Sequence, residues 1–234
     1  MRYSGVSEYG EGCKGIIEKT ILFLIPLFLY SPMRLFCQQF KIGFIGGIAT
    51  SQVDGDTYAG YNKVGLFAGG FVTKKFSAES KWSASFEITY IQKGSRKTPH
   101  PDKGDPFSYK LNLNYAEVPI LFKRAFTTPD SLLGQKAKFE FEAGIAIGVL
   151  VQSKEEDTGG PVAGGVPFQK YDIPFLLGLN YPVSDHFSTN IRYEYSILPV
   201  RKGAIGQYYQ NWTYKILKPG YYNNLLLFSL RYQI

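Results

Sequence analysis

The chain has 234 residues, of which 16% are aromatic and 25 are glycine, with only two cysteines and two methionines. Its length suits one large domain or two small ones. No apolar run reaches the roughly 18 residues that a membrane-spanning helix needs, so that class of membrane protein is excluded.

The first predicted element is a short apolar leader at residues 21–30, preceded by lysines. An apolar core of this length is too short to span a bilayer but suits a secretory signal peptide. We therefore expect residues 1–37 to be a signal peptide, cleaved after Cys37, and residues 38–234 to form the mature domain. A lipoprotein anchor at Cys37 is the weaker alternative, because Phe36 stands where a small residue would be expected.

Eight runs of alternating apolar and polar side chains follow the leader. Period-two alternation predicts strands with one apolar face. A soluble β-sandwich would share the alternation, but its strands average about five or six residues, whereas a tilted membrane strand needs about 9–11. The predicted strands span residues 40–50, 63–72, 81–92, 109–124, 136–151, 171–181, 187–197 and 222–234.

The connectors between these strands alternate in length. Long extracellular loops and short periplasmic turns are typical of outer-membrane barrels. The pattern predicts an all-β fold, an eight-stranded antiparallel transmembrane β-barrel with up-and-down meander order, in the outer membrane of a Gram-negative bacterium. The expected outer loops are residues 51–62, 93–108, 152–170 and 198–221, and the expected periplasmic turns are residues 73–80, 125–135 and 182–186.

The last strand indicates which face is which. Phe228, Leu230 and Tyr232 share one side, whereas Ser229 and Arg231 share the other. An arginine facing lipid at the centre of the membrane costs roughly 2–4 kcal/mol, so Arg231 is expected to point into the lumen.

The fourth strand breaks this alternation. Leu111 and Leu113 point one way, but Ile120 and Phe122, which should also face lipid, are out of phase with them. A β-bulge near Glu117 and Pro119 would bring both sets to the lipid face.

An eight-stranded barrel is just wide enough inside for side chains to fill it. Because isolated buried charges are costly, inward-facing charges of both signs predict a paired network that plugs the lumen. A proton or ion path through the same charges is the alternative. The predicted lumen residues are Lys41, Glu87, Glu140, Glu142, Asp172, Arg192, Glu194 and Arg231, with Glu117 as a possible addition.

Six stretches of the chain share the order and spacing of motifs in a known family: residues 64–69, 76–77, 86–94, 113–123, 141–144 and 191–195. They resemble PorT-like outer-membrane barrels of Bacteroidetes, and residues 113–123 resemble the family's strand YLEIPLLLK, with Ala116 in place of leucine. The resemblance covers nearly the whole mature chain and implies an eight-stranded outer-membrane barrel. The family's namesake is associated with protein secretion by the type IX pathway, but the shared motifs belong to the barrel wall and carry over no site.

No residues form a recognisable catalytic, cofactor or metal site. His100 falls in an expected outer loop and His186 in a periplasmic turn, so they should lie at opposite ends of the barrel. We therefore expect no enzyme activity and no cofactor. The alternative is a hydrolase at the outer rim that uses His100 with Asp102 and Asp105.

The last outer loop is the one binding candidate, since it combines basic and aromatic side chains without an acidic residue. Such a loop can contact lipid headgroups, including lipopolysaccharide, or grip a glycan, another anionic ligand or a protein partner. Nucleic acid is not an expected partner in this compartment, despite a pI near 9.2. The candidate residues are Arg201, Lys202, Tyr208, Tyr209, Trp212, Tyr214, Lys215 and Lys218.

The sequence thus predicts a non-enzymatic outer-membrane barrel with a plugged lumen. It would act as an anchor or as a binding and assembly component, together with envelope or secretion-system proteins. A small passive pore and an enzyme at the outer rim are the alternatives.

Overall fold

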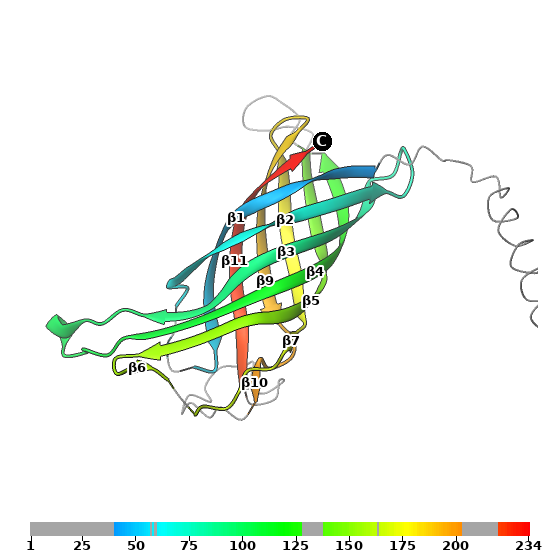
Figure 1. The fold of residues 1–234 in the computed structure, drawn as a ribbon. Coiled ribbons are helices and arrows are strands. Elements are labelled where there is room, and N and C mark those ends of the chain that lie inside the picture. Colours follow the sequence, from blue (N-terminus) through cyan, green and yellow to red (C-terminus); the bar gives the residue numbers. More distant parts are fainter. Residues whose placement is uncertain (1–39, 57, 59, 128–137, 163, 203–219) are drawn as a thin grey trace, which may run out of the picture. The chain divides into compact units, whose positions relative to one another are not determined.

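The computed structural model (Figure 1) describes residues 40–56, 58, 60–127, 138–162, 164–202 and 220–234. The expected signal peptide lies outside the described residues. Within these ranges, no helix has the length and apolar character needed to cross a membrane.

Eight long strands form a closed ring, each antiparallel to its neighbours along the order β1-β2-β3-β4-β5-β8-β9-β11. Pairing of β1 with β11, from Gly43 opposite Gln233 to Asp54 opposite Tyr222, closes the ring. The predicted eight-stranded antiparallel meander is confirmed. The ring strands are β1 (Phe40–Asp54), β2 (Lys63–Lys75), β3 (Trp82–Lys97), β4 (Tyr109–Thr127), β5 (Lys138–Asp157), β8 (Pro174–Pro182), β9 (Phe187–Ser196) and β11 (Gly220–Gln233). Shorter elements are the 3-10 helix η1 (Pro101–Lys103), β6 (Gly160–Pro161), β7 (Tyr171–Asp172) and β10 (Arg201–Lys202).

The outer surface of the ring is apolar. Phe44 is 63% exposed and Leu230 is 60% exposed, although both are large hydrophobic residues. On β11 the side chains alternate as predicted, with Phe228, Leu230 and Tyr232 exposed and Ser229 and Arg231 buried. The hydrophobic face of this sheet is therefore the outside.

Aromatic side chains gather on the outside at the end of the ring where the connectors are short. The guanidinium of Arg124 lies 5.1 Å from the ring centroids of both Trp82 and Phe126 there. Aromatic girdles of this kind mark the interfaces of transmembrane barrels. The outward residue at this end is aromatic in all ring strands except β2: Phe40, Trp82, Phe126, Phe139, Tyr181, Phe187 and Tyr232.

Strand β4 keeps its alternation throughout. Leu111, Leu113 and Tyr115 are fully buried on the inward face of the strand, which they share with Glu117. The predicted bulge near Glu117 and Pro119 is therefore wrong. The register instead shifts between Asn114 and Tyr115 on the side facing β5.

The reason for this difference is that the lumen is apolar near the long connectors. The assumption that every inward residue is polar is therefore wrong. The buried apolar cluster extends from the long connectors down to Ile45 and Phe71, which stand opposite Arg231 and Glu87 in the strand register. Its members are Ile45, Ala49, Val53, Phe67, Phe71, Ile91, Tyr109, Leu111, Leu113, Tyr115, Val200, Leu225 and Leu227.

Strands β3, β4 and β5 continue beyond the ring (Figure 1). The pairing of β2 with β3 ends at Phe67 opposite Ile91, whereas β3 pairs with β4 as far as Lys97 and β4 pairs with β5 as far as Asp157. We call residues 92–97, 109–114 and 152–157 the β3–β5 extension. Strands β3 and β5 are longer than predicted because their pairing with β4 continues into the expected outer loops, whereas β4 begins at Tyr109 as predicted.

Candidate functional site

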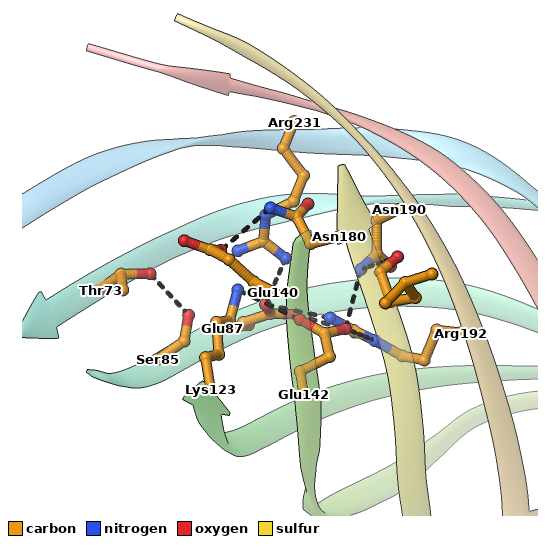
Figure 2. Close-up of polar contacts among 11 residues, drawn as sticks. Thr73, Ser85, Glu87, Lys123, Glu140, Glu142, Asn180, Asn190, Arg192 and Arg231 are labelled. Carbon is orange, nitrogen blue, oxygen red and sulfur yellow. Dashed lines mark hydrogen bonds and ion pairs between the residues drawn. The ribbon is translucent and has the colours of Figure 1, made fainter. Parts of the chain in front are cut away.

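Buried charges from four ring strands meet inside the barrel (Figure 2). Arg192 on β9 donates to both carboxylate oxygens of Glu87 on β3, at 2.9 and 3.2 Å, and its Nε donates to Glu142 on β5 at 2.8 Å. Arg231 on β11 donates to Glu87 at 2.7 Å. Such fork-shaped, charge-assisted contacts fix geometry as well as charge.

Two further side chains complete this arrangement. The Nζ of Lys123 lies 3.2 Å from Oε2 of Glu142, and the amide of Asn190 donates to Oε1 of the same carboxylate at 2.9 Å. The guanidinium of Arg231 also lies 4.0 Å from the ring centroid of Phe71. We call Glu87, Lys123, Glu142, Arg192 and Arg231 the arginine layer.

A second set of charges lies closer to the long connectors. The Nζ of Lys93 is 2.6 Å from Oε1 of Glu117 and 3.3 Å from Oδ2 of Asp172, and it also contacts Glu194. The amide of Asn223 donates to Asp172 at 2.9 Å. We call Lys93, Glu117, Asp172 and Glu194 the lysine layer.

Both layers are shut off from solvent. The exposed fraction is 0% for Glu87, Lys93, Glu142 and Asp172, and 1% for Arg192. A continuous water path along the lumen would expose these charges, and an eight-stranded interior leaves little space beside them. The charges of both layers therefore lie in a part of the interior that solvent does not reach.

The predicted lumen residues are found at three levels. Glu87, Glu142, Arg192 and Arg231 meet in the arginine layer, and Glu117, Asp172 and Glu194 meet in the lysine layer. Lys41 and Glu140 instead line a cavity of about 410 Å³ at the end with short connectors, where Glu140 accepts a hydrogen bond from Asn180 at 3.1 Å.

Sequence analysis missed two members of the layers. Lys93 was assigned to an outer loop because β3 was expected to end one residue earlier. Lys123 shares the inward face of β4 with Glu117 and Leu121. An unbroken alternation along β4 would have identified it.

The family model of the outer membrane protein beta-barrel domain matches residues 35–201. The chain belongs to this family. Its location is accordingly the outer membrane of a Gram-negative bacterium. Comparison with curated proteins gave no significant match.

Two solved structures illustrate the fold similarity of this outer-membrane barrel. Ail, the attachment invasion locus protein of Yersinia pestis, solved in complex with the heparin analogue sucrose octasulfate, is 12% identical with a TM-score of 0.41, over 83% of this chain and 99% of Ail. Neisserial surface protein A is 12% identical with a TM-score of 0.45, over 83% of this chain and 97% of that protein.

In an outer-membrane barrel, the short connectors face the periplasm and the long ones face the outside of the cell. The aromatic girdle that contains Trp82 and Phe126 therefore lies at the periplasmic interface. The apolar outer surface, with residues such as Phe44 and Leu230, meets lipid.

The predicted outer-loop site differs from the structure at Arg201. This side chain is only 8% exposed and forms two hydrogen bonds with Glu155 of the extension, at 2.6 and 3.2 Å, while its guanidinium lies 3.7 Å from the ring centroid of Phe168. Arg201 thus joins the last outer connector to the β3–β5 extension. Lys202 is exposed. Tyr208, Tyr209, Trp212, Tyr214, Lys215 and Lys218 lie outside the described residues.

Glu155 is the acidic half of this contact, outside the membrane. Burial acts to raise its pKa, but hydrogen bonds from Arg201 and from the Tyr109 hydroxyl, at 2.7 Å, hold the pKa below its ordinary value. We call Arg201, Glu155, Tyr109 and Phe168 the outer clasp.

The histidines lie at opposite ends of the barrel. His100 is exposed beside η1, and Nδ1 of His186 lies 2.9 Å from the carbonyl oxygen of Gln233 at the periplasmic end. His100 and Asp105 are joined through their backbones, while the Asp105 carboxylate pairs with Lys97 at 2.8 Å. Within the described ranges, no group of three or more His, Cys, Asp or Glu side chains could hold a metal ion.

Proposed function

We propose that this protein is a closed, non-enzymatic outer-membrane barrel that serves as an anchor or assembly component and offers its extracellular surface to a partner. The observation that carries the proposal is the pair of solvent-free ion layers across the lumen. Glu87 and Lys93, one from each layer, are both 0% exposed.

The same layers argue against a passive pore. Removing one partner from a buried ion pair leaves an uncompensated charge, at a cost of roughly 3–5 kcal/mol. Arg192 satisfies two carboxylates at once, so opening a path beside it would break contacts with both Glu87 and Glu142. These ion pairs therefore hold the strands of the barrel wall together from the inside.

A binding role is supported by the amount of ordered structure outside the membrane. The β3–β5 extension carries three strands beyond the ring, and the outer clasp ties it to the last extracellular connector through Glu155 and Arg201. A rigid surface loses less conformational entropy on binding than a loose loop does.

The kind of partner is supported by the resemblance to PorT-like barrels of Bacteroidetes, whose namesake is associated with protein secretion. We propose that the partner belongs to a secretion or envelope assembly. Crosslinking in the native membrane, followed by affinity purification of the full-length protein, tests this. Recovery of lipid alone would contradict it.

Conductance in a planar bilayer tests the closed lumen. The wild-type barrel should give no steady current. The variant Glu87→Ala/Lys93→Ala/Arg192→Ala, which truncates side chains in both layers, should conduct. A variant with the same number of alanines on the lipid face, Phe44→Ala/Phe86→Ala/Leu230→Ala, should stay silent. Steady currents from the wild type would overturn the proposal.

A further inference from the structure

The outward faces of β3, β4 and β5 change from apolar to polar at one common level. Tyr90 pairs with Ala116, which pairs with Val149, and the next outward row is Gln92, Asn114 and Gln152. The amide of Asn114 donates to Gln152 at 3.0 Å within that row. This row marks the edge of the hydrocarbon layer on the extracellular side.

Three cations stand on the outward face just above this edge. Lys154 lies two residues beyond Gln152, and Arg96 lies four residues beyond Gln92, opposite Lys110. At about 3.3 Å per residue and a strand tilt of about 45°, these positions are roughly 5–9 Å beyond the edge. That is the level of the lipid headgroups.

The charges at this level are unbalanced. Arg96 and Lys110 are both exposed and directly opposite each other, an arrangement of like charges that destabilises a sheet. Glu156 is the carboxylate of this row; it pairs with Lys154 at 2.6 Å and stands directly opposite Lys110. Three cations and one carboxylate leave the row with a net positive charge. An anion bound between the cations would relieve the repulsion.

A fourth cation increases the positive potential here. Lys63, at the extracellular end of β2, is 5% exposed and makes no ion pair within the described part of the chain.

The strand ends also form a hollow of about 270 Å³ beside two of these cations. Arg96 and Lys110 line it, together with Thr98 and Ser108, whose hydroxyls can donate hydrogen bonds. The carboxylates of Glu156 and Asp157 also line this hollow. Guanidinium, ammonium and hydroxyl groups are the donors that phosphate oxygens accept best.

We propose that the outward face of the β3–β5 extension binds a phosphate group of an outer-leaflet glycolipid through Arg96, Lys110 and Lys154. The lipid is the source because this face points away from the barrel axis and stands directly on the lipid belt. The proposal rests on the outer-membrane location and is independent of whether the lumen conducts or a protein partner binds.

The experiment compares thermal unfolding of the purified full-length barrel with lipopolysaccharide, dephosphorylated lipopolysaccharide or inorganic phosphate added. The test variant is Arg96→Gln/Lys110→Gln/Lys154→Gln. The control variant, Lys74→Gln/Lys75→Gln/Lys81→Gln, removes the same charge at the periplasmic end. Lipopolysaccharide retained through purification is counted by mass spectrometry.

We expect lipopolysaccharide to stabilise the wild type and the control variant more than the dephosphorylated lipid does, and the test variant to lose this difference. Its apparent affinity should fall by at least about tenfold, since each cation near an anionic leaflet contributes roughly 1 kcal/mol. Equal retention by the test variant would overturn the proposal. Equal stabilisation by inorganic phosphate alone would overturn the assignment to lipid.

Discussion

Arg192 and Glu87 are 105 residues apart in the chain, yet the guanidinium of one donates two hydrogen bonds to the carboxylate of the other across the barrel interior. Strands β9 and β3 are not neighbours in the ring. The contact therefore holds together opposite parts of the wall that share no backbone hydrogen bonds.

Replacing Arg192 with leucine should lower the free energy of unfolding by roughly 3–5 kcal/mol, because Glu87 and Glu142 would both lose a buried counter-ion. Urea unfolding in lipid vesicles measures this. Arg96→Leu, at an exposed position, should change the value by less than about 0.5 kcal/mol. Similar losses in both variants would contradict the role of the arginine layer.

Replacing Lys93 with methionine should have a comparable effect in the lysine layer. Methionine has a similar length but carries no charge, so Glu117, Asp172 and Glu194 would face one another without a cation, at a cost of roughly 3–5 kcal/mol. The matched control is Lys97→Met on the same strand, whose partly exposed pair with Asp105 contributes about 1 kcal/mol at most. If the two variants unfold at the same urea concentration, the lysine layer does not stabilise the barrel.

The β1–β11 closure should be sensitive to one methyl group. A Cβ on Gly47 would lie 2.0 Å from the carbonyl oxygen of Phe228, whereas a Cβ on the adjacent Gly46 would approach nothing closer than 3.9 Å. Gly47→Ala should therefore destabilise the barrel by about 1–3 kcal/mol through overpacking. Gly46→Ala should be close to neutral. Heat-modifiability on gels and urea unfolding measure both, and a neutral Gly47→Ala would contradict the close approach.

The outer clasp should open in acid. The pKa of Glu155 in the folded protein lies below its ordinary value of 4.5, so the carboxylate contributes stability above that pH. This contribution is lost as the pH falls through the lower folded value. The protection of the amides near Val200 against hydrogen exchange, measured relative to the intrinsic exchange rate at each pH, should fall below pH 4.5 in the wild type. In Glu155→Gln this protection should already be low at neutral pH and show no such transition.

The order of strands and half of their starting points could be predicted, because alternation extends over each whole strand. The starts at Phe40, Lys63, Tyr109 and Phe187 match the structure. The lipid face of β11 was also correct, since an arginine alternating with large apolar residues leaves one favourable orientation.

The strand ends could not be predicted. Strand β3 continues to Lys97 because β4 pairs with it there, and pairing partners are not visible in a single strand's pattern. Lys93 was missed for this reason. Leu111 and Leu113 were placed outside because the apolar face was assumed to meet lipid along the whole strand. In the β3–β5 extension the apolar face is buried instead, and the outward face carries Lys110 and Asn114.

The composition of the arginine layer has a consequence for how the barrel is assembled. Glu87, on the third ring strand, finds its two arginines on β9 and β11, the last two ring strands in chain order. Until β9 and β11 join the sheet, the carboxylate of Glu87 must stay hydrated. Expulsion of water from the interior is thus tied to the arrival of β11, which also supplies the final edge for β1.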